Sequence, residues 1–582
     1  MSQNPFEVMR RREQADTGMA LLAGGRVAEA EARFKALLTD EAGNPEALHG
    51  LACVALASGK AALAIGLAGR ALNDGNLSEA QRGRFYLTLA QGLADEHHLE
   101  PARAALHVSI LLQPLNPRAH LLMGTILAGL GRLDDSLIAL SEALRLAPDD
   151  LSCMQALGAQ LMRAERKAEA VGVFQDIVAR RPDLAAAWAN LGAALFECGA
   201  FEEAYAALLR AVETSDDVAA ETLNNLGLVE MARGHLLAAG RAFEDAARRA
   251  PDDLRVRNNH ATLLSELGEA KRASASLRDI MITNAGEEAV RAEFNHAALL
   301  LGQGRMAEGW AAFQSRSAFV PLAPETWDGQ PTDRPVTIHA EQGLGDIVQF
   351  LRYLPMAAER APLRVCLPDA AGKLLALMPS LANLPPGRVQ VASASEEGLS
   401  ANLLSLPFLL HCHDAPDPAP YFVVDVAPVR GRIGIMWSGS RHYRFDRRRS
   451  LTRAQIAPVF DVPGIEFLCL QKDVSDADLA GMVHADMSDL AATARAVASC
   501  ELIIGVDSVV VHLAGALGRP AWLLNRYGGD WRWRGPSWYE SITMFQATTP
   551  DVPDIAWPPV VARVVEALRA DVSGGVLASK RG

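Results

Sequence analysis

A pair of adjacent residues, one large and one small, returns along the first half of the chain at a nearly fixed spacing. Successive pairs are 34 residues apart, and the last follows at 35: Leu89-Ala90, Met123-Gly124, Leu157-Gly158, Leu191-Gly192 and Leu226-Gly227. A second small position shares the period, at Ala102, Ser136, Ala170, Ala204 and Ala239, and a large one follows it, at Leu106, Leu140, Phe174, Leu208 and Phe243. Such a period is the signature of a solenoid, in which similar units stack in a row.

The pattern within one period predicts two helices joined by a turn. The small residues let the two helices approach closely, and we expect the large residues to fill the groove to the next unit. Proline cannot continue the hydrogen-bond ladder of a helix and therefore ends the second helix of most units. It stands at Pro114, Pro148, Pro182 and Pro251, and Asp216 takes its place once.

These units resemble the tetratricopeptide repeat, whose signature is clearest at Trp188, Leu191 and Gly192. The pattern continues back to Phe34 and forward to a looser unit at 293–316, which predicts a solenoid of about eight or nine units over residues 1–320. Such a stack has a concave groove that suits docking of a protein, although a spacer or a dimerisation arm is the plainer alternative. Asparagines on the first helices could bind an extended peptide or simply be solvated: Asn190, Asn224, Asn225 and Asn258.

Bulk composition narrows the class of protein. The chain has 582 residues, of which 50% are hydrophobic and 21% charged, so it should form more than one globular domain. Most of its net charge of −13 lies in residues 1–330, which argues against a nucleic-acid scaffold. Residues 1–20 lack an apolar leader segment and no apolar run is long enough for a membrane span, so we expect a cytoplasmic protein.

The cysteines do not predict a disulfide framework or a metal site. There are seven of them, scattered along the chain and without a CxxC pair. His411, Cys412 and His413 are adjacent, but a single triplet without a second ligand cluster does not indicate a metal.

From about Pro335 the pattern changes to short β-branched runs that alternate with helices, which is typical of an α/β sheet. The expected strands are 336–339, 364–367, 389–392, 432–437, 467–470, 502–506 and 521–524, and the last helix is expected at 560–570. The proline-rich stretch 413–422 suggests a linker. We therefore predict two Rossmann-like lobes, 321–425 and 426–582, with ligands in a cleft at the carboxyl ends of the strands.

Several stretches of this half resemble bacterial two-lobe (GT-B) glycosyltransferases, most of all those fused behind tetratricopeptide repeats. They are HAEQGLGDIVQFLRYLP, LLSLPFLL, GIMWSGSRHYRFDRRRSL, LQKD, DSVVVHLAGALGRPAWLL and DWRWRGPSWYES. The second lobe is similar to that of the lipopolysaccharide heptosyltransferases. Proteins with this layout include alphaproteobacterial flagellin glycosyltransferases, which attach nonulosonic acids. The resemblance implies a sugar-nucleotide co-substrate, such as a CMP-nonulosonic acid, and a protein acceptor, such as flagellin.

The turn at Asp507-Ser508 is the main candidate for binding the donor phosphate. It follows an expected strand and opens a helix, whose N-terminus offers unpaired amides and a partial positive charge. In the resembling families the equivalent turn binds this phosphate, and His512 lies one turn further on. The alternative is that Asp507 only caps the helix and that His512 packs in the lobe.

A second candidate is the arginine-rich run RHYRFDRRR at 441–449, which follows the flexible residues Ser438 and Gly439. A charge run is usually a solvated surface, but this one stands at the carboxyl end of a strand. The resemblance selects Arg449 as the ligand of a phosphate or a carboxylate, since a guanidinium suits both anions.

Further residues are weaker candidates for the donor site. Lys472 could contact the nucleotide or be an ordinary surface lysine. Trp531 and Trp533 could form a wall for a sugar or base, or belong to a packing cluster under the C-terminal helix. The chain has no GxGxxG and no Walker lysine loop, and no DxD-like pair is placed for a metal, so we expect transfer without a metal.

The loop at 341–345 and the helix expected from Asp346 form the acceptor side of the site. Gly343 and Gly345 allow a tight turn and a close approach of substrate. In the heptosyltransferase-like families a Gly-Asp at this turn supplies the presumed base, which here is Asp346, although a helix cap is the plainer role.

The leading hypothesis is a protein O-glycosyltransferase that moves a nonulosonic acid to serine or threonine of flagellin held by the repeats. The alternatives are a heptosyl- or N-acetylglucosaminyltransferase acting on glycan or another protein, and a repeat adaptor with a decayed transferase domain. The sequence does not give the oligomeric state.

Overall fold

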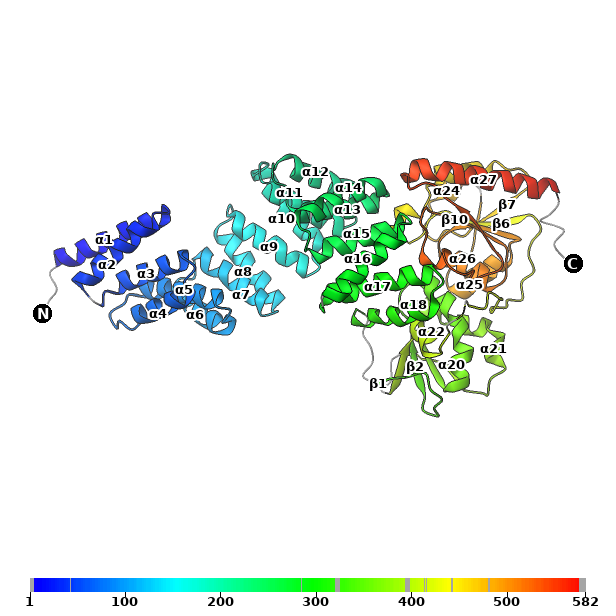
Figure 1. The fold of residues 1–582 in the computed structure, drawn as a ribbon, viewed down its shortest axis with the longest axis horizontal. Coiled ribbons are helices and arrows are strands. Elements are labelled where there is room, and N and C mark those ends of the chain that lie inside the picture. Colours follow the sequence, from blue (N-terminus) through cyan, green and yellow to red (C-terminus); the bar gives the residue numbers. More distant parts are fainter. Residues whose placement is uncertain are drawn as a thin grey trace. The chain divides into compact units, whose positions relative to one another are not determined.

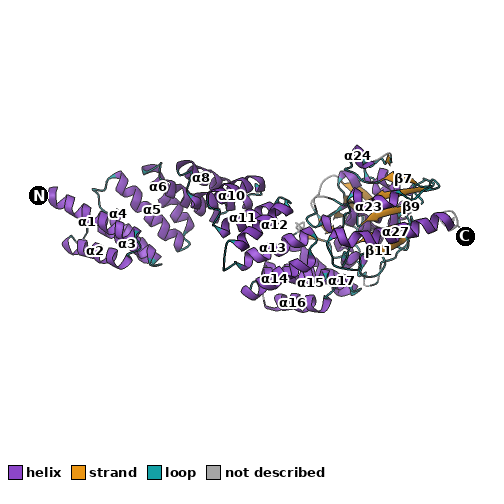
Figure 2. Ribbon diagram, turned by 90° about the horizontal axis from the view of Figure 1, so that it is seen from above, coloured by secondary structure: helices purple, strands orange, loops and turns teal. Residues whose placement is uncertain are grey.

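The computed structural model describes residues 5–41, 43–283, 285–319, 325–392, 398–412, 414, 416–440, 443–479 and 482–574. The chain divides into two compact units, Met1–Asp216 and Asp217–Gly582. The first unit is built of helices, whereas the second combines further helices with the strands of the molecule (Figures 1 and 2).

The predicted helix-turn-helix repeats are present in both units. In the first unit they are α1 (Pro5–Ala23), α2 (Val27–Asp40), α3 (Pro45–Ala57), α4 (Ala61–Leu72), α5 (Glu79–Asp95), α6 (Leu99–Leu112), α7 (Pro117–Gly129), α8 (Leu133–Leu146), α9 (Leu151–Arg163), α10 (Lys167–Arg180), α11 (Ala185–Glu197) and α12 (Phe201–Glu213). The second unit continues with α13 (Ala220–Arg233), α14 (Leu236–Arg249), α15 (Leu254–Glu266), α16 (Ala270–Thr283), α17 (Glu287–Gly302) and α18 (Met306–Phe313).

Contacts between a glycine and a large side chain explain the period of the repeats. A Cβ atom on Gly124 would lie 2.4 Å from Leu140 Cγ, and one on Gly192 would lie 2.5 Å from Leu208 Cγ. Each large residue therefore packs on the glycine of its own helix pair, not only against the next pair as the sequence suggested. Phe34 does both, because it lies against Gly18 of its own pair and Gly50 of the next. Any larger residue at these glycines would push the helices apart.

Two parallel sheets follow the repeats in the second unit. The first has the order β1-β5-β2-β3-β4, and the second has the order β11-β10-β9-β6-β7-β8. Their strands are β1 (Glu325–Thr326), β2 (Val336–His339), β3 (Leu363–Cys366), β4 (Val389–Ala392), β5 (Leu399–Asn402), β6 (Arg432–Met436), β7 (Glu466–Cys469), β8 (Val483–His484), β9 (Leu502–Val506), β10 (Ala521–Asn525) and β11 (Ile542–Gln546). All neighbouring strands are parallel, so their carboxyl ends lie along one edge of each sheet.

Helices connect and cover these strands. They are α19 (Leu344–Phe350), α20 (Leu354–Arg360), α21 (Pro379–Ala382), α22 (Leu406–Leu409), α23 (Arg453–Phe460), α24 (Asp476–Leu479), α25 (Leu490–Ala498), α26 (Val509–Ala516) and α27 (Pro553–Gly574). The seven expected strands lie within one residue of their observed bounds, and α27 extends beyond the expected helix at both ends. The strands not expected are β1, β5, β8 and β11; β1 and β8 have two residues each, too few to form a pattern.

The hydrophobic core of the second unit runs without a break from the last repeat into both sheets. Trp310 of α18 packs edge-on against Phe350, Trp531 and Trp538, with ring centroids 5.8, 5.8 and 6.4 Å away. The same buried cluster includes Val336 of β2 and residues of α25 and α26. A second cluster joins the other face of the second sheet to α27 around Trp557. The last repeats are therefore part of the same packed body as the sheets.

Two turns, one between α13 and α14 and one between α15 and α16, contact the second sheet's surroundings. Their partners are the start of α27 and the loop after β10. A Cβ atom on Gly528 would lie 2.3 Å from the carbonyl oxygen of Glu266, and one on Gly234 would lie 2.7 Å from Pro553 Cδ. Glu266, at the end of α15, forms ion pairs with Arg448, Arg526 and Arg534. Burial opposes ionisation of Glu266, but the charges of Arg448 and Arg526 outweigh it and hold the pKa of this carboxyl well below its usual range. This contact joins the repeats to the loop that carries Arg449.

Candidate functional site

The loop after β2 turns directly into α19, and Asp346 lies in the first turn of that helix. The helix begins at Leu344, two residues earlier than expected, because Gly343 takes the capping position. The backbone N–H of Gly343 donates to Asp346 Oδ2 at 3.1 Å. One oxygen of the carboxylate therefore stabilises the helix start, and the other remains available to a second partner.

Arg532 is that second partner, and it comes from the loop after β10. Its Nη2 group donates to Asp346 Oδ1, its Nη1 group donates to Asp530 Oδ1 at 2.8 Å, and its Nε group donates to Gln349 Oε1 at 2.9 Å. Burial of Arg532 is outweighed by Asp346, Asp530 and Asp507, which raise the pKa of its guanidinium. The guanidinium thus joins a carboxylate of the first sheet's loop to two from the second sheet.

Gly345 brings α19 against α26. A Cβ atom on Gly345 would lie 3.0 Å from His512 Cδ2 and 3.8 Å from the Cα of Val509, the first residue of α26. An alanine there would require the His512 ring to shift by a few tenths of an ångström. We expected a substrate to come close to this glycine. In the structure the start of α26 lies against it, and the approach of a substrate stays a prediction.

The turn from β9 into α26 carries Asp507 and Ser508, as expected. Burial raises the pKa of the Asp507 carboxyl and Asp530 raises it further, while Arg449, Trp533 and Arg532 act in the opposite direction. Ser508 occupies the capping position of α26, yet its side chain makes no capping hydrogen bond. Its buried hydroxyl has no hydrogen-bond partner among the described residues, which leaves a polar group available to a ligand.

His512 is buried and neutral. Its Nδ1 atom lies 3.0 Å from the Tyr539 hydroxyl, and its ring stacks on Trp533 with centroids 5.1 Å apart. Burial, together with the charge of Arg532, lowers the pKa of His512 to about 3. His512 therefore cannot supply positive charge to a phosphate near neutral pH, and its predicted donor-binding role is limited to hydrogen bonding or packing.

The loop after β6 is organised around Asp446. Arg449 Nε donates to Asp446 Oδ1 at 2.9 Å, and Ser450 Oγ donates to Asp446 Oδ2 at 2.7 Å. Ser450 Oγ also accepts the N–H of Gly439 at 2.8 Å, and a Cβ atom on Gly439 would lie 2.7 Å from Arg449 Nη2. Arg449 thus lies against the glycine loop, with its guanidinium 4.8 Å from the centre of the Tyr443 ring.

Arg448, the neighbour of Arg449 in the run, has a different partner. Arg448 points away to Glu266, and burial lowers the pKa of its guanidinium, although Glu266 acts in the opposite direction. Arg441 lies outside the described residues.

Ser438 and Lys472 follow neighbouring strands of the second sheet. The N–H of Ser438 donates to Gln471 Oε1 at 3.0 Å, so the glutamine holds the start of the glycine loop. Lys472 is exposed. Its predicted contact with a nucleotide stays a prediction.

The two tryptophans of the predicted wall have different surroundings. Trp531 is buried against Trp310, Phe313 and Trp538, so it packs against the last repeat rather than under the C-terminal helix. Trp533 is partly exposed, stacks on His512 and lies close enough to Asp507 to lower the pKa of that carboxyl. Trp533 is therefore the better placed of the two for a ligand.

The candidate asparagines of the repeats fall into two groups. Asn224 Oδ1 accepts from Asn259 at 2.9 Å, and Asn258 Oδ1 accepts from Asn295 at 2.8 Å, so these side chains link successive repeats. Asn190 is exposed and Asn225 half-buried. Docking of a peptide on these residues stays a prediction.

Sequence reasoning missed Asp530, Arg532 and Glu266. Asp530 and Arg532 lie in the stretch DWRWRG, which was singled out for its tryptophans. The partner of Arg532 is 186 residues earlier in the chain, and that of Arg448 is 182 residues earlier. No local pattern indicates such pairs.

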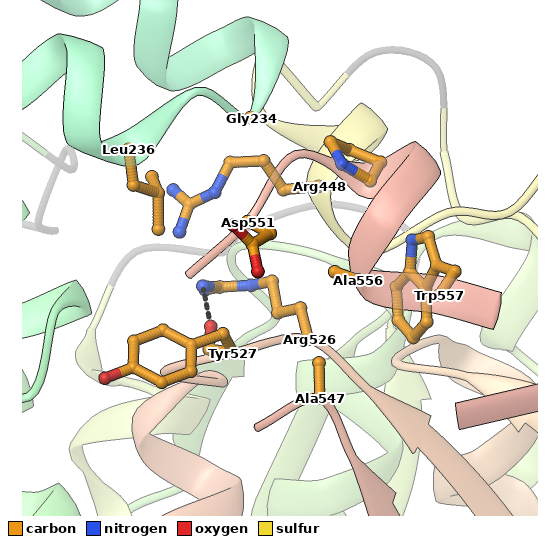
Figure 3. Close-up of a pocket in the computed structure, with 10 residues that line it drawn as sticks. Gly234, Leu236, Arg448, Arg526, Tyr527, Ala547, Asp551, Ala556 and Trp557 are labelled. Carbon is orange, nitrogen blue, oxygen red and sulfur yellow. Dashed lines mark hydrogen bonds between the residues drawn. The ribbon is translucent and has the colours of Figure 1, made fainter. Parts of the chain in front are cut away.

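A small pocket of about 20 Å³ lies between the turn of α13–α14 and the second sheet (Figure 3). Gly234 and Leu236 line it from the repeats, and Arg448 and Arg526 line it from the loops. Asp551 faces Arg526 across this pocket. This pocket is separate from the residues Asp346 and Asp507. The cleft expected at those two residues stays a prediction.

The described residues hold no group of three or more His, Cys, Asp or Glu placed to bind a metal ion. Within those same residues, no helix has both the length and the apolar character that crossing a membrane requires.

The chain is similar to known proteins in its repeats and, for one relative, over most of its length. The sequence profile of the tetratricopeptide repeat matches residues 16–77, 87–150 and 156–220. The chain is 28% identical over 500 residues to protein FlbA of Caulobacter vibrioides, covering 75% of this chain and 82% of FlbA.

Solved structures match the helical part. MamA from Desulfovibrio magneticus RS-1 is 21% identical, covers 30% of this chain and 99% of its own, and has a TM-score of 0.29. YrrB, described as a repeat protein with an unusual peptide-binding site, is 19% identical, covers 32% of this chain and 95% of its own, and has a TM-score of 0.29. The apo form of RapI is 13% identical, covers 52% and 96%, and has a TM-score of 0.43. The match of the sequence profile shows that the chain carries tetratricopeptide repeats, an architecture that offers extended surfaces to other proteins.

Proposed function

We propose that this chain is a glycosyltransferase, which moves a sugar from a nucleotide-activated donor to a hydroxyl group of a protein bound by the repeats. The observation that carries the proposal is the meeting of α19 and α26 at Gly345 and His512. This contact gathers Asp346 with the turn at Asp507-Ser508, and Arg532 lies among these carboxylates. The two sheets act, in this proposal, as the acceptor and donor lobes of a GT-B enzyme.

The residues fit the chemical requirements of glycosyl transfer. The acceptor oxygen forms a bond to the anomeric carbon while the bond from that carbon to the donor phosphate breaks and the phosphate leaves with the electron pair. The Asp346 carboxylate takes the proton of the acceptor hydroxyl. Arg532, Arg449 and the N-terminal amides of α26 stabilise the charge on the departing phosphate.

The finer assignment rests on the resemblance of the sequence motifs. It selects flagellin as the acceptor, with transfer to serine or threonine, and a CMP-nonulosonic acid as the donor. The arginines support an anionic donor of this kind, because a guanidinium binds a sugar carboxylate as well as a phosphate.

Two measurements test the proposal. Intact mass spectrometry of flagellin from cells with and without this gene should differ by whole sugar residues, and equal masses would contradict the flagellin assignment. A thermal-shift screen of the purified chain against CMP-, UDP- and ADP-sugars should show stabilisation by one class of donor. Stabilisation by none of them would favour a non-catalytic adaptor.

A further inference from the structure

Arg532 has little hydrogen-bonding capacity to spare for an incoming anion. Three of its five N–H groups already donate to Gln349, Asp530 and Asp346, and its side chain is 11% exposed. An anion that pairs with both Nη atoms therefore competes with Asp346 and Asp530, which each hold one of these atoms.

Asp346 is the partner that an anion would displace. Asp530 holds Arg532 twice, because its Oδ1 atom also accepts the backbone N–H of Arg532 at 3.1 Å. Gln349 is uncharged and fully buried. Asp346 instead comes from the loop of the other sheet, and its Oδ2 atom keeps the N–H of Gly343 as a partner after Arg532 leaves.

The charges around Arg532 also favour exchange of a partner over simple addition of an anion. Asp346, Asp530 and Asp507 all act on this one guanidinium, and Arg449, which also acts on Asp507, is paired with Asp446. An anion added to this arrangement would face the carboxylates that already surround Arg532. If Arg532 turns toward the anion, the new pair offsets the loss of the pair with Asp346.

Unsatisfied donors indicate that the ligand is rich in acceptors. Gln349 Nε2 and Ser508 Oγ are buried and have no hydrogen-bond partner among the described residues. Gln349 is bonded to Arg532 through its other side-chain atom, Oε1. Buried donors of this kind lower the free energy of a complex when a ligand supplies acceptors.

We propose that Arg532 is a switch between Asp346 and the anionic group of the donor. Without a ligand, Arg532 holds the Asp346 carboxylate and blocks its use as a base. When a nucleotide sugar binds, Arg532 pairs with its phosphate or carboxylate, and Asp346 Oδ1 becomes available to the acceptor hydroxyl. The inference rests on the proposed function and adds an order to it, because the donor must bind before the base is released.

A double-mutant cycle on nucleotide binding tests this switch without needing turnover. Dissociation constants for CMP, UDP and ADP are measured by calorimetry on the full chain, on Asp346→Asn, on Arg532→Gln and on the double variant. Asp346→Asn should bind the preferred nucleotide about tenfold more tightly, because Arg532 no longer has to leave a carboxylate. Arg532→Gln should bind it at least about tenfold more weakly, and adding Asp346→Asn to it should bring no gain.

The exposed Asp461 provides a matched control, because Asp461→Asn also removes one negative charge but lies at the end of α23. It should leave the dissociation constant within about twofold of the original. Circular dichroism and thermal melting show whether each variant is folded. Unchanged or weaker binding in Asp346→Asn, or a gain that persists without Arg532, would overturn the switch alone. Absence of binding of any of the three nucleotides to the original chain would contradict the proposed function and the switch together.

Discussion

The repeats of the first unit and those of the second share one packing rule but use their charged residues differently. Gly158 lies against Phe174 in the first unit as Gly227 lies against Phe243 in the second. In the first unit, pairs such as Arg166 and Glu169 are three residues apart on one helix and exposed. In the second, the pairs Glu266–Arg448 and Glu341–Arg316 are buried and connect the helical segments to loops of the α/β region. In the first unit the repeats therefore pack on one another. In the second unit they also hold the loops that carry the candidate site.

The largest loss of stability should come from removing the Glu266 carboxylate, which connects the repeats of the second unit to its α/β region. Glu266→Ala would leave Arg448, which is 5% exposed, buried without its partner. Breaking a buried pair on one side typically costs about 3–5 kcal/mol, so we expect a large fall in the melting temperature of the second unit.

The matched control lies in the repeats of the first unit. Glu169→Ala breaks an ion pair whose side chains are half exposed, and it should leave the melting temperature unchanged. Calorimetric melting of both variants makes the comparison, and equal melting curves would show that the buried pair contributes nothing to the stability of the second unit.

A smaller effect is expected from Gly528→Ala. Gly528 has φ +74°, and its added Cβ atom would lie 2.3 Å from the backbone oxygen of Glu266. Gly464→Ala is the control, because Gly464 has φ +82° and open space around it, so it carries only the backbone strain of about 1–2 kcal/mol. Hydrogen exchange at the turn after α15 should rise in Gly528→Ala alone. The same rise in both variants would mean that the contact is unimportant.

The effect that is smallest at neutral pH is a pH dependence that belongs to the first unit. His49 lies under Phe85, with ring centroids 4.3 Å apart, and burial lowers its pKa to about 3. The unfolded chain therefore binds a proton that the folded chain does not, so stability is complete above the ordinary pKa near 6.5 and falls as the pH drops toward 3. The slope should be at most about 1.4 kcal/mol per pH unit.

His49→Gln tests this contribution, since glutamine keeps a polar group near Thr88 but does not titrate. The difference in melting temperature between this variant and the original chain should shrink as the pH falls from 7 to 4. A difference that stays constant over this range would exclude His49 as the source.

The sequence predicts the parts of this structure whose causes are local. A glycine that must accept Leu140 or Phe174 recurs with the repeat, and β-branched runs such as 502–506 form strands wherever they pair. Pairs between distant segments have no such signal. The contact of Arg532 with Asp346 depends on how the two sheets are brought together. Asn190 is exposed, whereas Asn258 is hydrogen-bonded to Asn295 of the next repeat. This difference depends on which neighbour each repeat faces.

The account depends most on Asp346 as the base that accepts the proton of a protein hydroxyl. Its most direct test is the intact mass of flagellin from cells in which the gene carries Asp346→Asn, compared with cells that carry Asp461→Asn. We predict that the Asp461→Asn cells retain the sugar mass on flagellin, and that the Asp346→Asn cells lose it although they contain a similar amount of folded protein. Flagellin of unchanged mass in the Asp346→Asn cells would contradict the account.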